Sequence, residues 1–311
     1  MDRTTHMDTG LEKADRCRVV LLYNPKGGVG KTTLAANLTL AMARLPQYAG
    51  RRVAAVDLDL SGANLSTVLY RLPLEEVRHR NLARWPELGL EEGRGAALWD
   101  YLFKGPDGIA IAAAPFNLSE GHCLNHRSTD RIFQALMAQF DLLVVDGGPG
   151  ITDAVDMALH HATEVLAVTN REGQSLAQLS KLISALDCPE DFTLDVQAAE
   201  GDAALRQAMR ERLGKLRVVL NNTLPGGRHR LEREDVETVL GQPVYAEIPY
   251  GERVLEALHG KESRQALDLD RRGPFARAVC QLAGRLAGEE PETFPIPDKG
   301  SLKGLFSRRR P

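Results

Sequence analysis

Short, unbroken apolar runs recur along the chain, separated by longer segments of mixed polarity. Such runs are typical of strands that are buried on both faces of a sheet. They lie at residues 19–22, 53–56, 109–114, 142–145, 165–168, 218–220 and 244–248. Strands that alternate with helices through short connections form a mostly parallel sheet. The pattern therefore predicts an α/β fold with a single doubly wound, mostly parallel sheet and helices on both faces.

Helix-like segments lie between these runs. One covers about residues 31–45, and another ends near residue 139, with Ser128 predicted as its N-cap. A third begins near Ser175, and a strongly charged one at residues 203–213 is expected to face solvent. No internal repeat is evident, so we expect one domain over residues 17–288.

The first apolar run leads directly into a glycine-rich loop and a helix. The loop reads Tyr23-Asn24-Pro25-Lys26-Gly27-Gly28-Val29-Gly30-Lys31-Thr32-Thr33. This order of strand, loop, Lys-Thr and helix is that of a phosphate-binding loop, whose backbone N–H groups cradle phosphates. Lys31 is expected to reach the β- and γ-phosphates, and the Thr32 hydroxyl to ligate Mg²⁺. Pro25 replaces the first glycine of the strict pattern, and Lys26 is an additional lysine. The loop predicts a nucleotide site.

Carboxylates follow two later strands. Asp57 and Asp59 end the second apolar run, and Asp146 ends the run at residues 142–145. Ligands of open α/β sheets bind beyond the carboxyl ends of the strands. An apolar strand that delivers an acid towards Mg²⁺ is the second half of an NTPase site. These acids therefore make the loop an expected Mg²⁺-ATP site.

Composition limits the other classes of function. Of the 311 residues, 43% are hydrophobic and 26% are charged, and the net charge of −3 gives no global reason to expect nucleic-acid binding. No apolar run approaches the roughly 18 residues of a membrane span. Residues 1–16 are polar and are predicted to be a disordered leader without a signal-peptide core. A cytosolic protein is expected.

The four cysteines are scattered and form no C-x-x-C pair. They are Cys17, Cys123, Cys188 and Cys280. In a cytosolic protein they are expected to be reduced thiols rather than ligands of a metal cluster. A pairing of two of them across a dimer stays open.

Three segments stand apart from the strand–helix pattern. Residues 71–95 are polar without a clear period and are a candidate insertion. Residues 289–298, rich in proline and glutamate, are predicted to be a linker. The tail at residues 299–311 combines an apolar helical face with basic residues and no acid, as interfacial membrane helices do. Residues expected to contact anionic lipid are Lys299, Leu302, Lys303, Leu305 and Phe306. A solubilising tail and a partner-docking helix are the alternatives.

The loop, the acids and the tail together resemble the deviant-Walker ATPases, the superfamily of the ParA partition ATPases and the septum-site-determining ATPase MinD. The resemblance covers about residues 18–288, and its most specific part is the loop at residues 26–33. The acids at residues 56–59 followed by Asn64 are similar to the MinD switch region, and residues 299–306 resemble the MinD membrane-targeting tail. Parts of the chain also look like the CpaE/TadZ and FlhG positioning ATPases.

This resemblance implies a role for each matching position. Lys26 matches the signature lysine, which reaches across an ATP-bound homodimer to the phosphates of the partner and makes hydrolysis depend on dimerisation. Asp59 matches the acid associated with the attacking water. Asp57 and Asp146 match the acids near Mg²⁺. Catalysis is thus expected from Lys26, Lys31 and Asp59, and metal binding from Thr32, Asp57 and Asp146.

The base of the nucleotide is expected to lie against two late strands. Asn221 matches a base-recognition asparagine, although Asn222 beside it is an equally good amide. Pro249 and Tyr250 lie where the family's loop packs on adenine. The full set of predicted nucleotide contacts is Gly27, Gly28, Val29, Gly30, Lys31, Thr32, Thr33, Asn221 and Pro249.

The function that the resemblance implies is an ATP-driven positional switch at the inner face of the membrane, stimulated by a protein partner. It would position a division, flagellar or pilus machinery. The alternative is a ParA-type ATPase that binds nucleoid DNA through Arg206, Arg210, Arg212, Lys215 and Arg217. Because acids such as Glu211 interrupt that basic run, DNA binding is not expected. An iron–sulfur carrier is disfavoured because paired cysteine motifs are absent.

Overall fold

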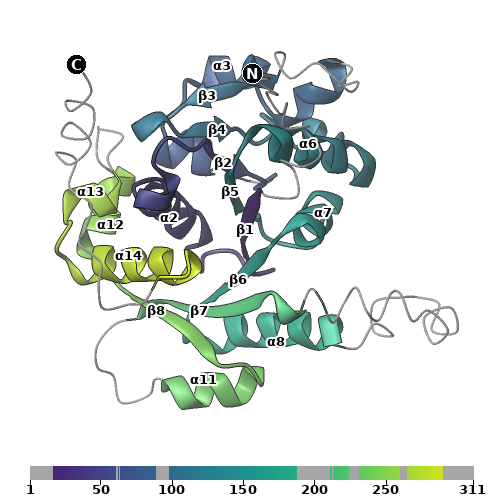
Figure 1. Ribbon diagram of the computed structural model, residues 1–311. Coiled ribbons are helices and arrows are strands. Elements are labelled where there is room, and N and C mark those ends of the chain that lie inside the picture. The colour runs from purple at the N-terminus through teal and green to yellow at the C-terminus, as the bar shows by residue number, and fades with distance from the viewer. Residues whose placement is uncertain are drawn as a thin grey trace, which may run out of the picture.

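The computed structural model describes residues 17–60, 62, 64–88, 98–187, 211, 213–223, 231–259 and 265–289. Within these residues one eight-stranded sheet has the order β3-β4-β2-β5-β1-β6-β7-β8 (Figure 1). Its strands are β1 (Arg18–Tyr23), β2 (Val53–Asp57), β3 (Leu102–Lys104), β4 (Ala110–Ala112), β5 (Leu142–Asp146), β6 (Glu164–Thr169), β7 (Leu216–Thr223) and β8 (Val244–Pro249). All neighbouring strands pair in parallel except β3 and β4. The predicted fold class is confirmed.

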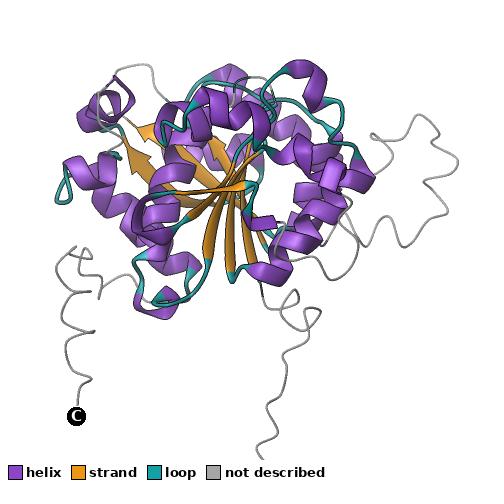
Figure 2. Ribbon diagram, turned by 90° about the horizontal axis from the view of Figure 1, so that it is seen from above, coloured by secondary structure: helices purple, strands orange, loops and turns teal. Residues whose placement is uncertain are grey.

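Helices cover both faces of the sheet, as Figure 2 shows from above. The longer ones are α2 (Lys31–Ala43), α6 (His126–Gln139), α7 (Asp153–His161), α8 (Gly173–Asp187), α11 (Arg233–Leu240), α12 (Glu252–His259) and α14 (Pro274–Leu286). Shorter ones are α3 (Leu74–His79), α5 (Leu118–Gly121) and α13 (Ala266–Leu269). Buried side chains of α6, α7, α8 and α11 share one core, and those of α2, α13 and α14 share the other.

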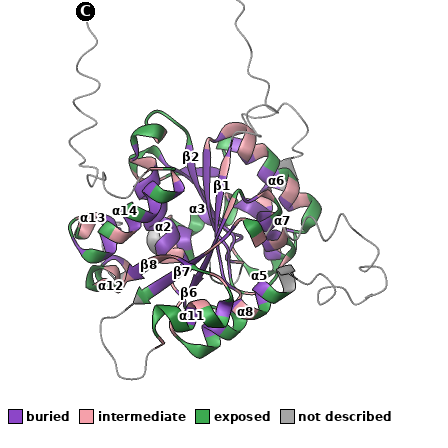
Figure 3. Cartoon of the chain, turned by 60° about the horizontal axis from the view of Figure 1, so that its bottom comes forward, coloured by how far each residue is buried: buried purple, intermediate pink, exposed green. Residues whose placement is uncertain are grey.

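The strands supply both cores because successive side chains point to opposite faces. In β1, Val19 and Leu21 join the core under α6 and α7, whereas Val20 and Leu22 join the core under α2. All four are fully buried. Figure 3 shows burial over the whole sheet: most strand positions are buried, and exposed positions lie mainly on the helices and connecting loops. Burial on both faces explains why the apolar runs show no alternation.

The sheet edge and one helix cap differ from the sequence-based expectation. The strand expected at residues 109–114 is confined to β4, and the short antiparallel strand β3 beside it was not predicted. With only three residues, β3 has no readable period. The cap of α6 is Asn125 instead of Ser128: the Asn125 side chain accepts a hydrogen bond from the Ser128 N–H at 3.0 Å. The Ser128 hydroxyl donates to the Cys123 carbonyl at 2.7 Å, so it is engaged elsewhere.

Part of the segment at residues 71–95 packs into the domain. Trp85 is fully buried in the core of α6 and α7, and Val77 of α3 is buried in the opposite core. The Leu82 N–H donates to the Ala113 carbonyl at 2.9 Å, beside the end of β4. Residues 74–88 therefore cover the β4 side of the sheet. Residues 89–95 lie outside the described residues, as do the leader, residues 290–298 of the linker, the tail and most of residues 203–213.

The described cysteines are not in disulfides, and Cys188 lies outside the described part of the chain. Cys17 and Cys280 are buried, and Cys123 is exposed. The same part of the chain contains no cluster of histidine, cysteine and acidic side chains that could hold a metal ion. None of its helices is both long enough and apolar enough to cross a membrane.

Candidate nucleotide-binding site

The glycine-rich loop joins β1 to α2 at the carboxyl edge of the sheet. Gly28 and Gly30 have left-handed φ angles of 80° and 87°, which glycine adopts without steric cost. A Cβ on Gly30 would lie 2.3 Å from the Asn221 side-chain nitrogen at the end of β7. Asn221 also donates to the Val29 carbonyl at 2.9 Å. Two distant parts of the chain therefore fix the shape of the loop.

Lys31 is buried at the first position of α2. Its ammonium group donates to the backbone carbonyls of Asn24 at 3.0 Å and Lys26 at 2.9 Å. Burial lowers the pKa of Lys31, and the nearby carboxylates of Asp146 and Asp59 oppose that shift. In this arrangement the lysine folds back onto its own loop, with its charge facing the acids of the site.

Asp57 and Asp146 end adjacent parallel strands and lie opposite each other in the β2–β5 register. Asp57 accepts hydrogen bonds from the Asp59 N–H at 3.1 Å and from the Ser66 N–H and hydroxyl at 3.0 and 2.9 Å. Both carboxylate oxygens of Asp146 are buried without a hydrogen-bond partner. Burial raises the pKa of Asp146 to about 8, and the neighbouring Asp57 adds to the shift. Burial likewise raises the pKa of Asp57 to about 6.

This pair fits a divalent cation. A buried carboxylate without a partner is costly, and a cation removes the cost. The nearby Thr32 hydroxyl lowers the pKa of Asp146. Two carboxylates and a hydroxyl are oxygen ligands of the type Mg²⁺ prefers. Thr32, Asp57 and Asp146 could therefore hold Mg²⁺ directly or through water.

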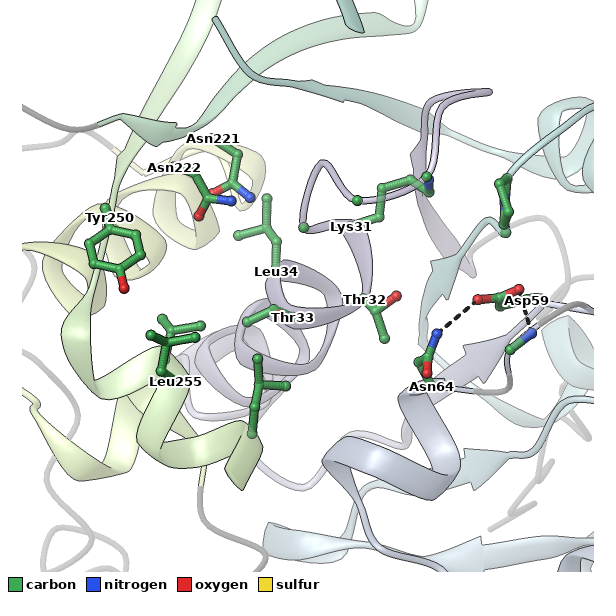
Figure 4. Close-up of a pocket in the computed structure, with 18 of the residues that line it drawn as sticks. Lys31, Thr32, Thr33, Leu34, Asp59, Asn64, Asn221, Asn222, Tyr250 and Leu255 are labelled. Carbon is green, nitrogen blue, oxygen red and sulfur yellow. Dashed lines mark hydrogen bonds between the residues drawn. The ribbon is translucent and has the colours of Figure 1, made fainter. Parts of the chain in front are cut away.

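Asp59 lies at the start of the switch segment, which we define as residues 57–66. Its carboxylate accepts hydrogen bonds from the Gly62 N–H at 3.0 Å and from the Asn64 side chain at 3.2 Å (Figure 4). The turn after β5 packs closely against the Asp59 backbone, since a Cβ on Gly148 would lie 2.8 Å from the Asp59 Cα. Only glycine permits this approach. The Gly150 N–H also donates to the Pro25 carbonyl at 2.9 Å, which ties this turn to the phosphate loop.

Lys26 points away from the phosphate loop. Its ammonium group lies 2.7 Å from the Glu172 carboxylate at the start of α8, and this ion pair lowers the pKa of Glu172. The Lys26 side chain is 23% exposed and that of Glu172 is 65% exposed. The two lysines predicted to be catalytic therefore differ in position. Lys31 lines the cavity, whereas Lys26 does not line it and pairs with Glu172.

A cavity of about 510 Å³ lies over the loop. Figure 4 shows its two ends: Thr32, Asp59 and Asn64 lie together at one, and Asn222, Tyr250 and Leu255 at the other. We call them the phosphate end and the base end. The residues that line the cavity are Gly27, Gly28, Gly30, Lys31, Thr32, Thr33, Leu34, Asp59, Gly62, Asn64, Gly148, Pro149, Asn221, Asn222, Tyr250, Val254, Leu255, Leu258 and Phe275.

Some residues expected in the site lie beside the cavity. Val29, Asp57 and Asp146 are buried behind its lining, and Pro249 ends β8 one residue before the lining residue Tyr250. At the base end, Asn221 is buried and bonded to the loop, whereas the exposed Asn222 has a left-handed φ of 55°. The predicted membrane-binding residues lie outside the described part of the chain.

The sequence patterns did not predict the apolar wall of the base end. Its members are Val254, Leu255, Leu258 and Phe275. Val254, Leu255 and Leu258 fall at i, i+1 and i+4 on α12, a helical spacing that predicts one apolar face. The spacing was readable, but ordinarily it indicates a core-facing helix rather than a ligand site. Phe275 of α14 gave no signal in the sequence.

A phosphate-type loop, paired acids behind it and a cavity above it define the class of P-loop nucleotide-binding proteins. Residues 20–263 match the model of the CobQ/CobB/MinD/ParA nucleotide-binding domain family. The chain therefore belongs to this family, as the sequence resemblance predicted.

Individual relatives are similar over nearly the whole chain. The chain is 30% identical over 296 residues to the antiactivator FleN of Pseudomonas aeruginosa, covering 94% of this chain and 92% of FleN. It is 26% identical over 300 residues to the septum site-determining protein MinD of Helicobacter pylori, covering 93% of this chain and 99% of that protein. Among solved structures, MinD of Pyrococcus horikoshii complexed with Mg-ADP matches with a TM-score of 0.63 and 22% identity, over 94% of this chain and all of that one.

Proposed function

We propose that the protein is an ATP-binding and ATP-hydrolysing switch that dimerises with ATP and reversibly binds the inner membrane surface to position a cellular machinery. The observation that carries the proposal is the buried pair of Asp57 and Asp146 behind the phosphate loop, where both Asp146 oxygens lack a partner. The relatives FleN and MinD, and the Mg-ADP bound by a structural neighbour, support it.

Within the site, each side chain has a separate task. Bound Mg²⁺ would neutralise charge on the β- and γ-phosphates. Lys31 would turn from its two carbonyl partners to the phosphates, and the glycine-rich backbone would hold them. Asp59 would orient the attacking water, and the N–H of Gly62 and the amide of Asn64 already hold its carboxylate in place. Together these side chains supply positioning and charge, which phosphoryl transfer chiefly requires.

Lys26 would make hydrolysis depend on dimerisation. In the single chain it pairs with Glu172 at 2.7 Å and does not line the cavity. In an ATP-bound dimer it would instead reach the partner's phosphates and stabilise charge in the transition state, as arginine fingers do. Hydrolysis would then require two chains, and an activating protein partner would act on that dimer.

The tail supplies the membrane contact. Leu302, Leu305 and Phe306 would insert into the lipid interface, with Lys299 and Lys303 beside anionic headgroups. One such tail binds weakly, whereas two tails on a dimer bind in concert. ATP binding would thereby control peripheral association with the cytoplasmic membrane.

Mixing two inactive variants tests the trans role of Lys26. Lys26→Ala and Asp59→Asn are each expected to lose about 100-fold in hydrolysis. When they are mixed, a heterodimer has one site with its own Asp59 and the partner's Lys26, so activity measured as phosphate release should reappear. Continued inactivity in a mixture shown to form heterodimers by a tag-based pull-down would contradict action in trans.

The membrane step is tested by sedimentation with anionic vesicles. With ATP, the wild-type protein should pellet with the vesicles, whereas a Leu305→Glu/Phe306→Glu variant should stay in solution and retain hydrolysis. Leu74→Glu, at an exposed leucine of α3, is the matched control. Unchanged vesicle binding by the tail variant would remove the tail from the proposal. ATP-dependent retention on DNA with a steep salt dependence would favour the ParA-type alternative.

A further inference from the structure

Arg71 adopts a backbone conformation that its side chain disfavours. Its φ is 51°, in the left-handed region, and among the described non-glycine residues it shares this feature with Asp107 and Asn222. Non-glycine residues stay in this region only where their surroundings hold them there, commonly at functional sites. The contacts of the Arg71 side chain show what holds it.

The Arg71 guanidinium binds the C-terminal turn of α12. One terminal nitrogen, Nη2, donates to the Leu258 carbonyl at 3.0 Å and to the Ala257 carbonyl at 3.5 Å. The last carbonyls of a helix have no partner within the helix, and this end carries the negative end of the helix dipole. A cationic donor that reaches two of these carbonyls is therefore a favourable cap.

The helix that Arg71 holds is the apolar wall of the base end. Val254, Leu255 and Leu258 line the cavity from α12. Leu255 leaves 46% of its surface exposed there, so it has area to offer a flat ring. A shift of α12 along its axis would move these side chains together, and the wall would lose its fit to the base.

The other end of the same segment is tied to the phosphate end. Ser66, at the end of the switch segment, donates two hydrogen bonds to Asp57. The Leu72 N–H then donates to the Ser66 carbonyl at 3.0 Å, which places Arg71 directly beside that anchor. Residues 65–72 thus join Asp57 to the C-terminus of α12 through a short chain of hydrogen bonds.

We propose that Arg71 is a positioning residue for the base end: it holds α12 against the switch segment and thereby sets the affinity for the nucleoside part of ATP. The inference rests on the proposed nucleotide function, since it assigns the α12 wall to the base. It requires no contact between Arg71 and the nucleotide.

The test compares ATP with inorganic tripolyphosphate, which has phosphates and no nucleoside, by titration calorimetry. Arg71→Gly removes the guanidinium and leaves a residue that adopts φ 51° freely, so the fold should be kept. Loss of a charge-assisted hydrogen bond should weaken ATP binding about tenfold. Tripolyphosphate binding should be unchanged. Arg71→Lys, which keeps a donor, should bind ATP with an affinity between those of the wild type and of Arg71→Gly.

Asp107→Gly is the matched control. Asp107 also has a left-handed φ, of 54°, and also carries a charged contact, to Arg44 at 2.7 Å. It does not line the cavity. This variant should bind ATP as the wild type does, so any loss in Arg71→Gly cannot come from the backbone change alone.

Two results would overturn the inference. Equal weakening of ATP and tripolyphosphate would show a general structural effect, and no change in ATP binding would show that α12 needs no anchor. The proposed function fails by a different result, in which the wild-type protein itself binds no ATP. That outcome would also remove the base-end assignment on which Arg71 depends.

Discussion

The phosphate end and the base end of the cavity are assembled in opposite ways. The phosphate end comes from an unbroken stretch, residues 26–33, together with turns directly after β2 and β5. Lys31, Asp57, Asp59 and Asp146 are buried there, and hydrogen bonds of about 3 Å hold Asp57 and Asp59 in place. The base end collects residues from β7, α12, α14 and the loop after β8, and most of its wall is apolar.

This difference matches two tasks: catalysis at the phosphate end and recognition of the base at the base end. Stabilising charge on a phosphoryl group requires fixed donors and acids within about an ångström of their places, which a short stretch of backbone can supply. Packing on a base requires area rather than exact direction, so separate helices can supply it. Substitutions should therefore be severe at the phosphate end and mild at the base end.

The largest effect is expected at Lys31. Lys31→Ala should reduce hydrolysis by at least about 100-fold, since it removes the buried cation that faces the phosphates. Phosphate release at saturating Mg²⁺-ATP measures this. Lys104→Ala, at an exposed lysine of the edge strand β3, should leave the rate unchanged. A Lys31→Ala variant with a near-normal rate would break the assignment of this end.

An intermediate effect is expected on stability at Asp146. Its carboxyl group binds a proton up to about pH 8 in the folded state and up to about pH 3.8 when unfolded. The folded state therefore binds more protons, so this contribution is fully present below the unfolded pKa and is lost as pH rises towards 8. The loss should reach up to about 1.4 kcal/mol per pH unit.

Urea unfolding without Mg²⁺ between pH 5 and 8 (about the window of the Asp146 shift) measures this. Asp146→Asn should flatten the pH dependence, because the amide has no proton to lose, while hydrolysis is abolished. Asp100→Asn, at an exposed acid, should keep the wild-type slope. A wild-type stability that rises over this window would contradict a buried, unpaired carboxyl group.

The smallest effect is expected at Leu255. Leu255→Ala should weaken ATP binding about fivefold through lost apolar contact, worth roughly 1 kcal/mol, and should leave tripolyphosphate binding unchanged. Calorimetric titration provides both values. Leu74→Ala is a control of the same residue type, at an exposed position on α3. Equal losses for both ligands would show that the two ends are not separable.

Much of the fold could be predicted because its signals are local. Most of the strands coincide with apolar runs, since strands buried on both faces need unbroken apolar sequence. The loop and the acids after β2 and β5 were readable because each function needs particular residue types at fixed spacing. Strand β3 and the Asn125 cap were missed, since a three-residue strand carries no period and Ser128 offered an equally good cap. The roles given to individual site residues remain predictions.

The sequence by itself determined the fold class, the phosphate loop and the carboxylates at the sheet edge. Only the tertiary structure decided which distant residues meet: Lys26 with Glu172, Asn221 with the loop, and Arg71 with the end of α12. These contacts depend on where separate elements come to lie, and no spacing along the chain encodes that. The phosphate loop consists of consecutive residues, so its sequence predicts it. The walls of the cavity form only after the sheet and both helix layers have packed.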